Sequence, residues 1–309
     1  MTDRTAPLER VATGVPGLDA VLQGGLLKGG VYIVQGPPGA GKTILGNQIC
    51  FAQAAAGGNA VYVTLLAESH TRMLAHMRGM SFFQPRMIPD RVYYVSCFKV
   101  LEGEGLDGLL KVLRTVTASR KASLLVLDGL VSAEEASPTA KDFKKFIHEL
   151  QSVTAITDCT ALLLGSTERP RDFRPEHTMV DGIIEVSDDL ARLRSIRHLQ
   201  VRKMRGANPI RGKHTLEITD DGIVIRPRIE TQLQPGPPGN MTPGDQRMKF
   251  GIEGLDAMLG GGLPSHSTTM LLGPSGCGKT TLGLQFLAAG AKAGEPGCAS
   301  VSTNELRSC

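Results

Sequence analysis

The sequence of 309 residues has no long hydrophobic run. No stretch of it approaches the roughly 18 consecutive apolar residues that a membrane-spanning helix requires. Its first residues, MTDRTAPLER, also lack the apolar core of a secretory signal. We therefore expect a cytoplasmic protein that has no membrane partner.

Clustered cysteines and a strong net charge are missing as well. No Cys-x-x-Cys occurs and no histidine stands at a ligand spacing from any of the six cysteines, which are Cys50, Cys97, Cys159, Cys277, Cys298 and Cys309. This scatter favours reduced thiols over a disulfide framework or a structural zinc site. The net charge is only +4, so composition alone does not indicate a nucleic-acid partner. Cations are concentrated only in residues 192–214, where a solvated basic hairpin would also account for them.

Three motifs occur twice, in the same order and with one constant offset. The pairs are Gly14–Asp19 with Gly251–Asp256, Gly24–Leu26 with Gly261–Leu263, and Gly36–Thr43 with Gly273–Thr280. Because no gap is needed to align them, the chain begins the same domain twice.

The two copies differ greatly in length. The first domain is predicted to span residues 11–230, and a linker rich in proline and glycine covers residues 231–247. The second copy, residues 248–309, is too short to complete the sheet of the first. We therefore expect a truncated second domain that is poorly ordered beyond Ala293.

Strands and helices alternate in the first copy. The predicted strands are 31–35, 60–65, 92–96, 123–127 and 160–164, and the predicted helices are 43–56, 106–119 and 139–157. Such alternation indicates βαβ units and a parallel sheet. After Asp181 the pattern changes to hairpins that end with Gly222–Arg226. The predicted fold is α/β, of the P-loop NTPase kind, with a mainly parallel central sheet and C-terminal β-hairpins.

The segment Gly36–Thr43 (GPPGAGKT) lies between a predicted strand and a predicted helix, which is the context that a P-loop requires. Glycines let the backbone amides wrap around phosphate oxygens at the helix N-terminus. Lys42 adds a positive charge for the β- and γ-phosphates, and the Thr43 hydroxyl is a Mg²⁺ ligand. The segment therefore predicts ATP and Mg²⁺ binding; the alternative is a chance match in a structural loop.

Two carboxylates follow strands that would end at the same edge of the sheet. Asp128 closes an apolar strand and would hold Mg²⁺ through a water, unless it caps the next turn. Glu68 follows the strand 60–65 and could polarise the water that attacks the γ-phosphate. Its alternative role is that of an acidic residue at a helix N-terminus. We expect the neighbouring His70 to be a surface residue.

Two cations stand two residues apart in the basic stretch. Lys203 and Arg205 would share one face of a strand and could contact a phosphate held by another subunit, in the manner of an arginine finger. A plain solvated face remains the alternative.

These motifs together resemble the KaiC family of RecA-type ATPases. The resemblance is carried by Thr13–Asp19, the P-loop, Tyr62–Thr64 with Glu68 and Ser69, Leu125–Asp128, Thr167–Arg169, Arg202–Gly206 and Ile218–Ile223. It covers nearly all of the first copy and the start of the second. The tandem P-loops joined by a linker match a double-domain layout.

The resemblance implies a RecA-like fold in hexameric rings of one protein, with ATP held between subunits. It implies that phosphates contact Gly39, Ala40, Gly41, Lys42, Thr43 and Ile44, and that Glu68 is the catalytic carboxylate. It also implies that the adjacent subunit's nucleotide is reached by Lys203, Met204, Arg205, Thr219 and Asp220. The second P-loop would use Gly276, Cys277, Gly278, Lys279 and Thr280.

The sequence departs from the family's clock protein in three places. Ala67 replaces one of two adjacent glutamates, and Ala207 and Pro209 replace a small hydroxyl residue and a histidine. The second copy has no Walker B acid, glutamates or phosphorylated hydroxyls, so we expect no autokinase activity of that kind.

The leading hypothesis is a ring-forming ATPase that acts in signalling or circadian-type regulation, with unknown protein partners. The alternatives are a DNA-dependent recombination or helicase ATPase, a nucleotide-binding module that hydrolyses little, and a serine/threonine autokinase. A RadA/Sms protein would carry a zinc ribbon, and no four-cysteine cluster precedes the first P-loop. The basic stretch keeps a nucleic-acid partner open but not favoured, because phosphate contacts need no sequence code.

Overall fold

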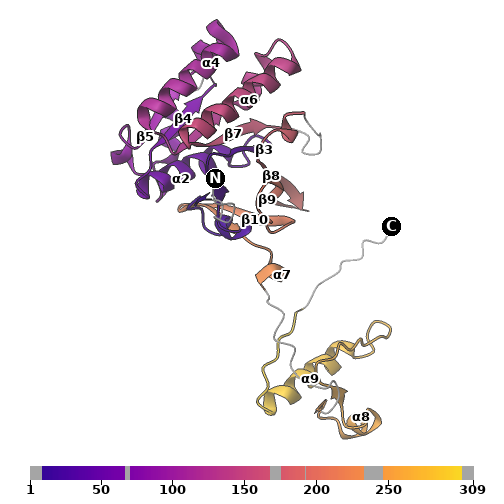
Figure 1. Cartoon of the computed structure of the whole chain (residues 1–309). Helices are drawn as coiled ribbons and strands as arrows, with labels where there is room; N and C mark the ends of the chain where they lie inside the picture. Colours follow the sequence, from indigo (N-terminus) through magenta and orange to yellow (C-terminus); the bar gives the residue numbers. More distant parts are fainter. Residues whose placement is uncertain (1–8, 67–69, 168–174, 192, 233–245, 301–309) are drawn as a thin grey trace, which may run out of the picture. The chain divides into compact units, whose positions relative to one another are not determined.

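The structure, a computed structural model, describes residues 9–66, 70–167, 175–191, 193–232 and 246–300 (Figure 1). Its internal contacts divide the chain into two units, Met1–Leu233 and Gln234–Cys309. In the described part of the chain, no helix is long and apolar enough to cross a membrane.

A nine-stranded sheet organises the first unit, in the order β11-β10-β9-β8-β3-β7-β6-β4-β5. Its strands are β3 (Val31–Gly36), β4 (Ala60–Thr64), β5 (Val92–Ser96), β6 (Leu124–Asp128), β7 (Thr160–Ser166), β8 (Gly182–Ala191), β9 (Arg194–Met204), β10 (Lys213–Thr219) and β11 (Gly222–Arg226). The six strands from β8 to β5 are parallel, and β8 to β11 pair antiparallel. This confirms the predicted fold class.

Helices cover both faces of this sheet (Figure 1). The side chains of α1 (Leu18–Val21), α2 (Lys42–Ala55) and α3 (His70–Met77) pack on one face, and those of α4 (Phe98–Arg120), α5 (Leu130–Glu135) and α6 (Ala140–Thr157) pack on the other. The unit also contains the short strands β1 (Arg10–Val11) and β2 (Leu26–Leu27), the 3₁₀ turns η1 (Pro85–Met87) and η2 (Pro175–Thr178), and α7 (Ile229–Gln232).

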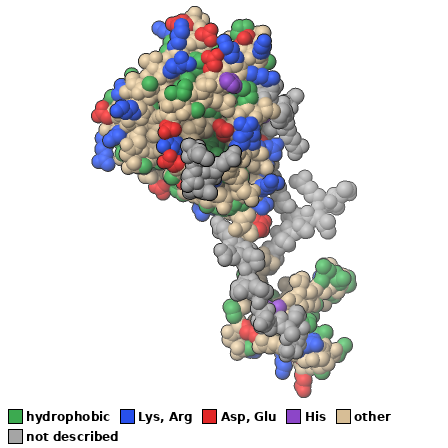
Figure 2. Space-filling model, in the orientation of Figure 1, with side chains coloured by type: hydrophobic (Ala, Val, Ile, Leu, Met, Phe, Trp, Pro, Cys, Tyr) green, Lys and Arg blue, Asp and Glu red, His purple; other side chains and the backbone are tan. Residues whose placement is uncertain are grey.

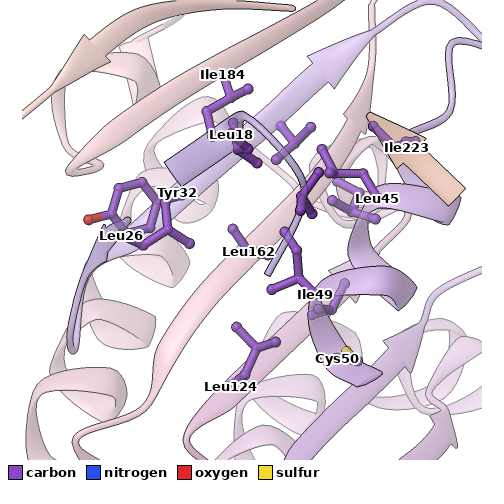
Figure 3. Close-up of a cluster of buried hydrophobic side chains, with 14 of the residues drawn as sticks. Leu18, Leu26, Tyr32, Leu45, Ile49, Cys50, Leu124, Leu162, Ile184 and Ile223 are labelled. Carbon is purple, nitrogen blue, oxygen red and sulfur yellow. The ribbon is translucent and has the colours of Figure 1, made fainter. Parts of the chain in front are cut away.

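Charged side chains of both signs are interspersed over the visible face of the first unit (Figure 2), and the apolar ones form two clusters against the sheet. Strand β6 shows how the sequence achieves this. Leu124 and Val126 join the cluster under α2, whereas Leu125 and Leu127 join the cluster under α4 and α6. Successive side chains of a strand point to opposite faces, so a strand covered on both sides must be apolar throughout. Figure 3 shows part of the first cluster.

Helix boundaries follow local chemistry. The Thr139 side chain accepts a hydrogen bond from the Asp142 amide at 3.2 Å, which caps the N-terminus of α6. Helix α4 begins at Phe98, earlier than the predicted start at 106, because Gly105 (φ 63°, ψ −155°) interrupts two helical segments without ending the element. Only glycine adopts such a conformation readily, and a glycine also interrupts the residue pattern that predicts one continuous helix.

The second unit has fewer elements in its described residues. They are β12 (Arg247–Met248), α8 (Glu253–Met258), β13 (Leu263–Pro264) and α9 (Lys279–Lys292). Residues 268–272, which correspond to the P-loop strand β3, form no strand. Met270 and Leu272 there are 76% and 84% exposed.

Candidate functional site

The loop between β3 and α2 has the geometry of a phosphate cradle. Gly39 and Gly41 adopt left-handed conformations (φ 77° and 99°), and a Cβ at Gly39 would meet no atom within 4 Å. The loop therefore leaves its amides open at the helix N-terminus, where they attract anions. Lys42 Nζ donates to the carbonyls of Gly36 and Pro37, at 2.8 Å each. Burial lowers the pKa of Lys42, and the Asp128 charge opposes that shift.

Asp128 and Thr43 meet at the carboxyl edge of the sheet. Asp128 is the last residue of β6 and is 8% exposed. The Thr43 hydroxyl donates to its Oδ2 at 3.0 Å, and the Tyr62 hydroxyl donates to the same oxygen at 2.7 Å. The following Gly129, not Asp128, occupies the N-cap position of α5, so the capping alternative does not describe this side chain. Hard oxygen donors at a strand edge fit Mg²⁺, and the adjacent cradle fits a polyphosphate.

Sequence reasoning missed a hydrogen-bond network beside this pair. Tyr94 donates to Asn47 Oδ1 at 2.7 Å, and Asn47 Nδ2 donates to the Thr43 carbonyl at 2.8 Å. Burial raises the pKa of Tyr62 and Tyr94 well above the usual range, the nearby Asp128 charge adding to the effect at Tyr62. Tyrosines in a strand look like ordinary β-formers, so only their position in the sheet could have revealed these roles.

Glu68 lies outside the described residues, and its catalytic role stays a prediction. The described residues before and after it, Leu66 and His70, lie at the carboxyl edge of the sheet, because His70 contacts Thr64 at the end of β4. Leu66 follows β4, and His70 begins α3. His70 Nε2 lies 2.8 Å from the Thr64 hydroxyl, and its ring lies 5.6 Å from that of Tyr94. The His70 side chain is partly buried rather than fully exposed, and burial lowers its pKa.

Lys203, Met204 and Arg205 lie far along the sheet from the chain's own P-loop. Lys203 is opposite Ile183 and Met204 is opposite Gly182, at the start of β8. Gly182 in turn aligns with Tyr32, near the amino end of β3, whereas the P-loop follows its carboxyl end.

The side chains of this group are held within their own chain. Lys203 donates to the carbonyls of His177 and Thr178 at 2.8 and 2.9 Å, and Arg205 donates to Thr178 and Met179 at 2.8 and 3.1 Å. Both cations thus donate to the Thr178 carbonyl, although Arg205 follows the last residue of β9.

Thr219 and Asp220 stand at the turn between β10 and β11, at the opposite end of the antiparallel strands. This hairpin packs against the chain's own P-loop. A Cβ at Gly41 would lie 3.0 Å from Ile218 Cδ1 and 3.3 Å from Ile223 Cδ1. The predicted set is therefore two separate groups in one chain, one beside the amino end of β3 and one beside the chain's own P-loop.

Acidic residues of β8 and the preceding turn pair with much of the basic stretch. The pairs are Arg197 with Asp188 (3.4 Å), Arg202 with Glu185 (3.0 Å), Lys213 with Asp189 (2.6 Å) and Arg205 with Asp181 (3.6 Å). Opposite charges facing each other across antiparallel strands stabilise a sheet modestly. Four cations of the basic stretch are thus paired with neighbouring carboxylates.

The second P-loop repeats part of this geometry. Gly276 and Gly278 are left-handed (φ 81° and 86°), and Lys279 Nζ donates to the carbonyls of Gly273 and Pro274 at 2.8 and 2.7 Å. Cys277 Sγ lies 3.8 Å from the same nitrogen. Among the described residues of this unit, no carboxylate hydrogen-bonds to Thr280.

Fold and site together define a P-loop protein of the RecA-like class. A family model described as "ATPase: KaiC" matches residues 11–230 and 248–307, and the chain belongs to this KaiC ATPase family. The resemblance expected from the motifs is thereby confirmed.

Three similar proteins illustrate this membership. The circadian clock protein KaiC3 of Synechocystis is 26% identical over 94% of this chain and 59% of its own length. A UPF0273 protein of Methanopyrus kandleri is 29% identical over 71% of this chain and 93% of its own. The crystal structure of the KaiC-like protein PH0186 from Pyrococcus horikoshii aligns with a TM-score of 0.63 at 23% identity, over 72% of this chain and all of that one.

The likeness to the solved structure shows the fold. The curated clock proteins are considerably longer than this chain. The chain spans 57% of the circadian clock oscillator protein KaiC of Rippkaea orientalis, at 23% identity. It therefore corresponds to little more than half of such a protein.

Proposed function

We propose that the first unit binds ATP with Mg²⁺ at Gly36–Thr43 and hydrolyses it to ADP and phosphate. The observation that carries this proposal is the 3.0 Å hydrogen bond between the P-loop Thr43 and the strand-end Asp128. These residues come from separate elements and meet beside an open amide cradle, which is the arrangement that a nucleotide-bound Mg²⁺ requires.

Each residue of the site has one task in this proposal. The loop amides and Lys42 bind the β- and γ-phosphates, Thr43 ligates the metal, and Asp128 holds it through a water. Bound Mg²⁺ supplies charge neutralisation for the phosphates. Glu68 orients and polarises the attacking water.

We propose further that the active form is a ring of copies. Lys203 and Arg205 lie beside the amino end of β3, away from the chain's own P-loop. In this proposal they exchange the carbonyls of residues 177–179 for a phosphate that a neighbouring copy binds. Cations supplied between subunits would stabilise the charge that develops during phosphoryl transfer. A regulatory role in signalling or timing is proposed from the names of the relatives alone.

Glu68→Gln tests the hydrolysis proposal in the full chain. Binding of ATP should persist, because the amide keeps the size and removes only the base, while turnover falls by about 10²–10⁴-fold. Glu102→Gln, an exposed position on α4, serves as the control. Unchanged turnover in Glu68→Gln would refute Glu68 as the activating carboxylate.

Mixing variants tests the ring. Arg205→Ala alone should lower turnover, and so should Lys42→Ala alone. Mixed assemblies contain interfaces in which an intact Arg205 meets an intact Lys42, so part of the activity should return. No recovery in mixtures that size-exclusion chromatography shows to be co-assembled would contradict the proposed action between subunits.

The DNA-dependent alternative is not supported by a specific observation, since acids pair with much of the basic stretch. ATPase measured with and without single-stranded DNA separates the two. Strong stimulation by DNA would favour the alternative.

A further inference from the structure

Two tyrosines stand side by side behind the proposed metal pair. Tyr62 of β4 and Tyr94 of β5 are register partners, and their ring centroids lie 5.5 Å apart on the face of the sheet that α2 covers. The next tyrosine, Tyr93, belongs to the cluster on the other face, and its ring lies 3.8 Å from the Arg120 guanidinium carbon.

The hydroxyl of Tyr62 is committed to Asp128. Its side chain is fully buried, and the 2.7 Å hydrogen bond to Asp128 Oδ2 is the contact that satisfies the phenol. A donor on a carboxylate oxygen orients the carboxylate and favours its charged form. Removing this donor would take away one of the hydrogen bonds that hold Asp128 Oδ2 beside Thr43.

The hydroxyl of Tyr94 is linked to Thr43, the other proposed metal-binding residue, through Asn47. It donates to Asn47 Oδ1, and the amide nitrogen of Asn47 donates to the Thr43 carbonyl one turn back in α2. The orientation of the Asn47 amide is thereby set, because its oxygen must accept and its nitrogen must donate. The first turn of α2, which carries Thr43, is tied to β5 by this route.

We propose that Tyr62 and Tyr94 are paired positioning residues for magnesium, Tyr62 holding Asp128 directly and Tyr94 holding Thr43 through Asn47. This inference rests on the proposed function, since it assigns the residues behind that site. Outer residues that orient metal ligands commonly contribute about 10–100-fold to metal affinity or activity. Ordinary core tyrosines would have no selective effect on a metal.

The test measures nucleotide binding by the full chain with a fluorescent N-methylanthraniloyl ATP, once with saturating Mg²⁺ and once with EDTA. The ratio of the two affinities is the gain due to the metal. Tyr62→Phe should reduce this gain by about tenfold and leave the affinity in EDTA unchanged. Tyr94→Phe should reduce it by a smaller factor, because it acts through Asn47.

Two matched controls separate positioning from stability. Tyr93→Phe removes a hydroxyl from the other face of the same strand. Tyr32→Phe removes a buried hydroxyl that accepts from the Leu27 amide at 2.7 Å, near the amino end of β3 and so at the other end of that strand from the P-loop. Figure 3 shows Tyr32 within the first apolar cluster. Both controls should keep the wild-type gain, even if Tyr32→Phe lowers the melting temperature.

The outcomes distinguish this inference from the function on which it rests. A wild-type chain that does not bind the nucleotide at all would overturn the proposed function. A wild-type chain with a clear Mg²⁺ gain that both tyrosine variants retain would overturn the inference alone, as would equal losses with Mg²⁺ and with EDTA. If Tyr62→Phe does not fold, the test depends on Tyr94→Phe, since Tyr94 is only partly buried.

Discussion

The two P-loops of this chain share a sequence motif and differ in what surrounds it. Much of their local geometry is the same. Asp19 accepts from the amides of Thr13 and Gly14 at 2.9 and 3.3 Å, and its counterpart Asp256 accepts from Phe250 and Gly251 at 2.7 and 3.0 Å.

The strand before the loop shows the difference. Strand β3 pairs with β7 on one side and β8 on the other, and all six of its residues are buried. The corresponding residues 268–272 form no strand, and Leu272 is 84% exposed. In the described residues, features whose partners are close in sequence are thus present in both units, whereas the buried strand that pairs with distant strands is present in the first.

The largest expected effect contrasts the two P-loop lysines. Lys42→Ala should abolish detectable ATP binding or lower turnover by about 10²–10³-fold, because it removes the positive charge proposed to bind the β- and γ-phosphates. Lys279→Ala should leave turnover unchanged, since no carboxylate in the described part of its unit completes the site. Steady-state phosphate release measures both. Equal losses would show that the second loop takes part in hydrolysis.

A second contrast concerns the strand itself. Ile33→Ala in β3, where the side chain is 2% exposed, should lower the free energy of unfolding by about 2–5 kcal/mol. Met270→Ala, at the corresponding and exposed position, should change it by no more than about 0.5 kcal/mol. Urea unfolding followed by circular dichroism gives both values. A large loss at Met270 would mean that this segment is packed in solution.

Corresponding glycines should respond with opposite sign. Gly17 is left-handed (φ 77°), and a Cβ there would lie 1.8 Å from the Ile225 carbonyl oxygen, so Gly17→Ala should destabilise by about 2 kcal/mol or more. Gly254 lies in α8 with no atom within 4 Å of a Cβ, so Gly254→Ala should be neutral or stabilise by about 0.5–1 kcal/mol. Thermal unfolding of the two variants checks the signs.

The smallest expected effect is a pH dependence that comes from His70 in the first unit. Burial lowers the pKa of His70 from 6.5, so the unfolded chain binds its proton more readily than the folded chain. Stability should therefore be full above about pH 6.5 and decline as the pH falls towards the folded pKa. His70→Gln should flatten that part of the profile relative to His76→Gln, an exposed position on the same helix. An identical slope in both variants would contradict this role.

The sequence predicted those features that depend on local pattern. The apolar run before Asp128 predicted a strand covered on both faces, and the glycine spacing predicted the phosphate cradle. The order of the strands in the sheet and the register between them could not be predicted from local pattern. The partnership of Tyr62 with Asp128, and of Arg202 with Glu185, depends on which strands lie side by side. The start of α4 at Phe98 was missed because Gly105 separates the residues before it from the predicted helix 106–119.

The pairing of β3 has a consequence for the order in which the chain folds during synthesis. The Asp19 loop can close as soon as its own residues have emerged from the ribosome. Strand β3 must wait for β7 and β8, whose residues follow more than a hundred positions later, and its first amide is bonded to Asp181. Contacts of such long range form slowly. The nucleotide site is therefore expected to mature late, so a nascent chain that ends before β8 would carry the complete P-loop motif and still lack the strand that presents it.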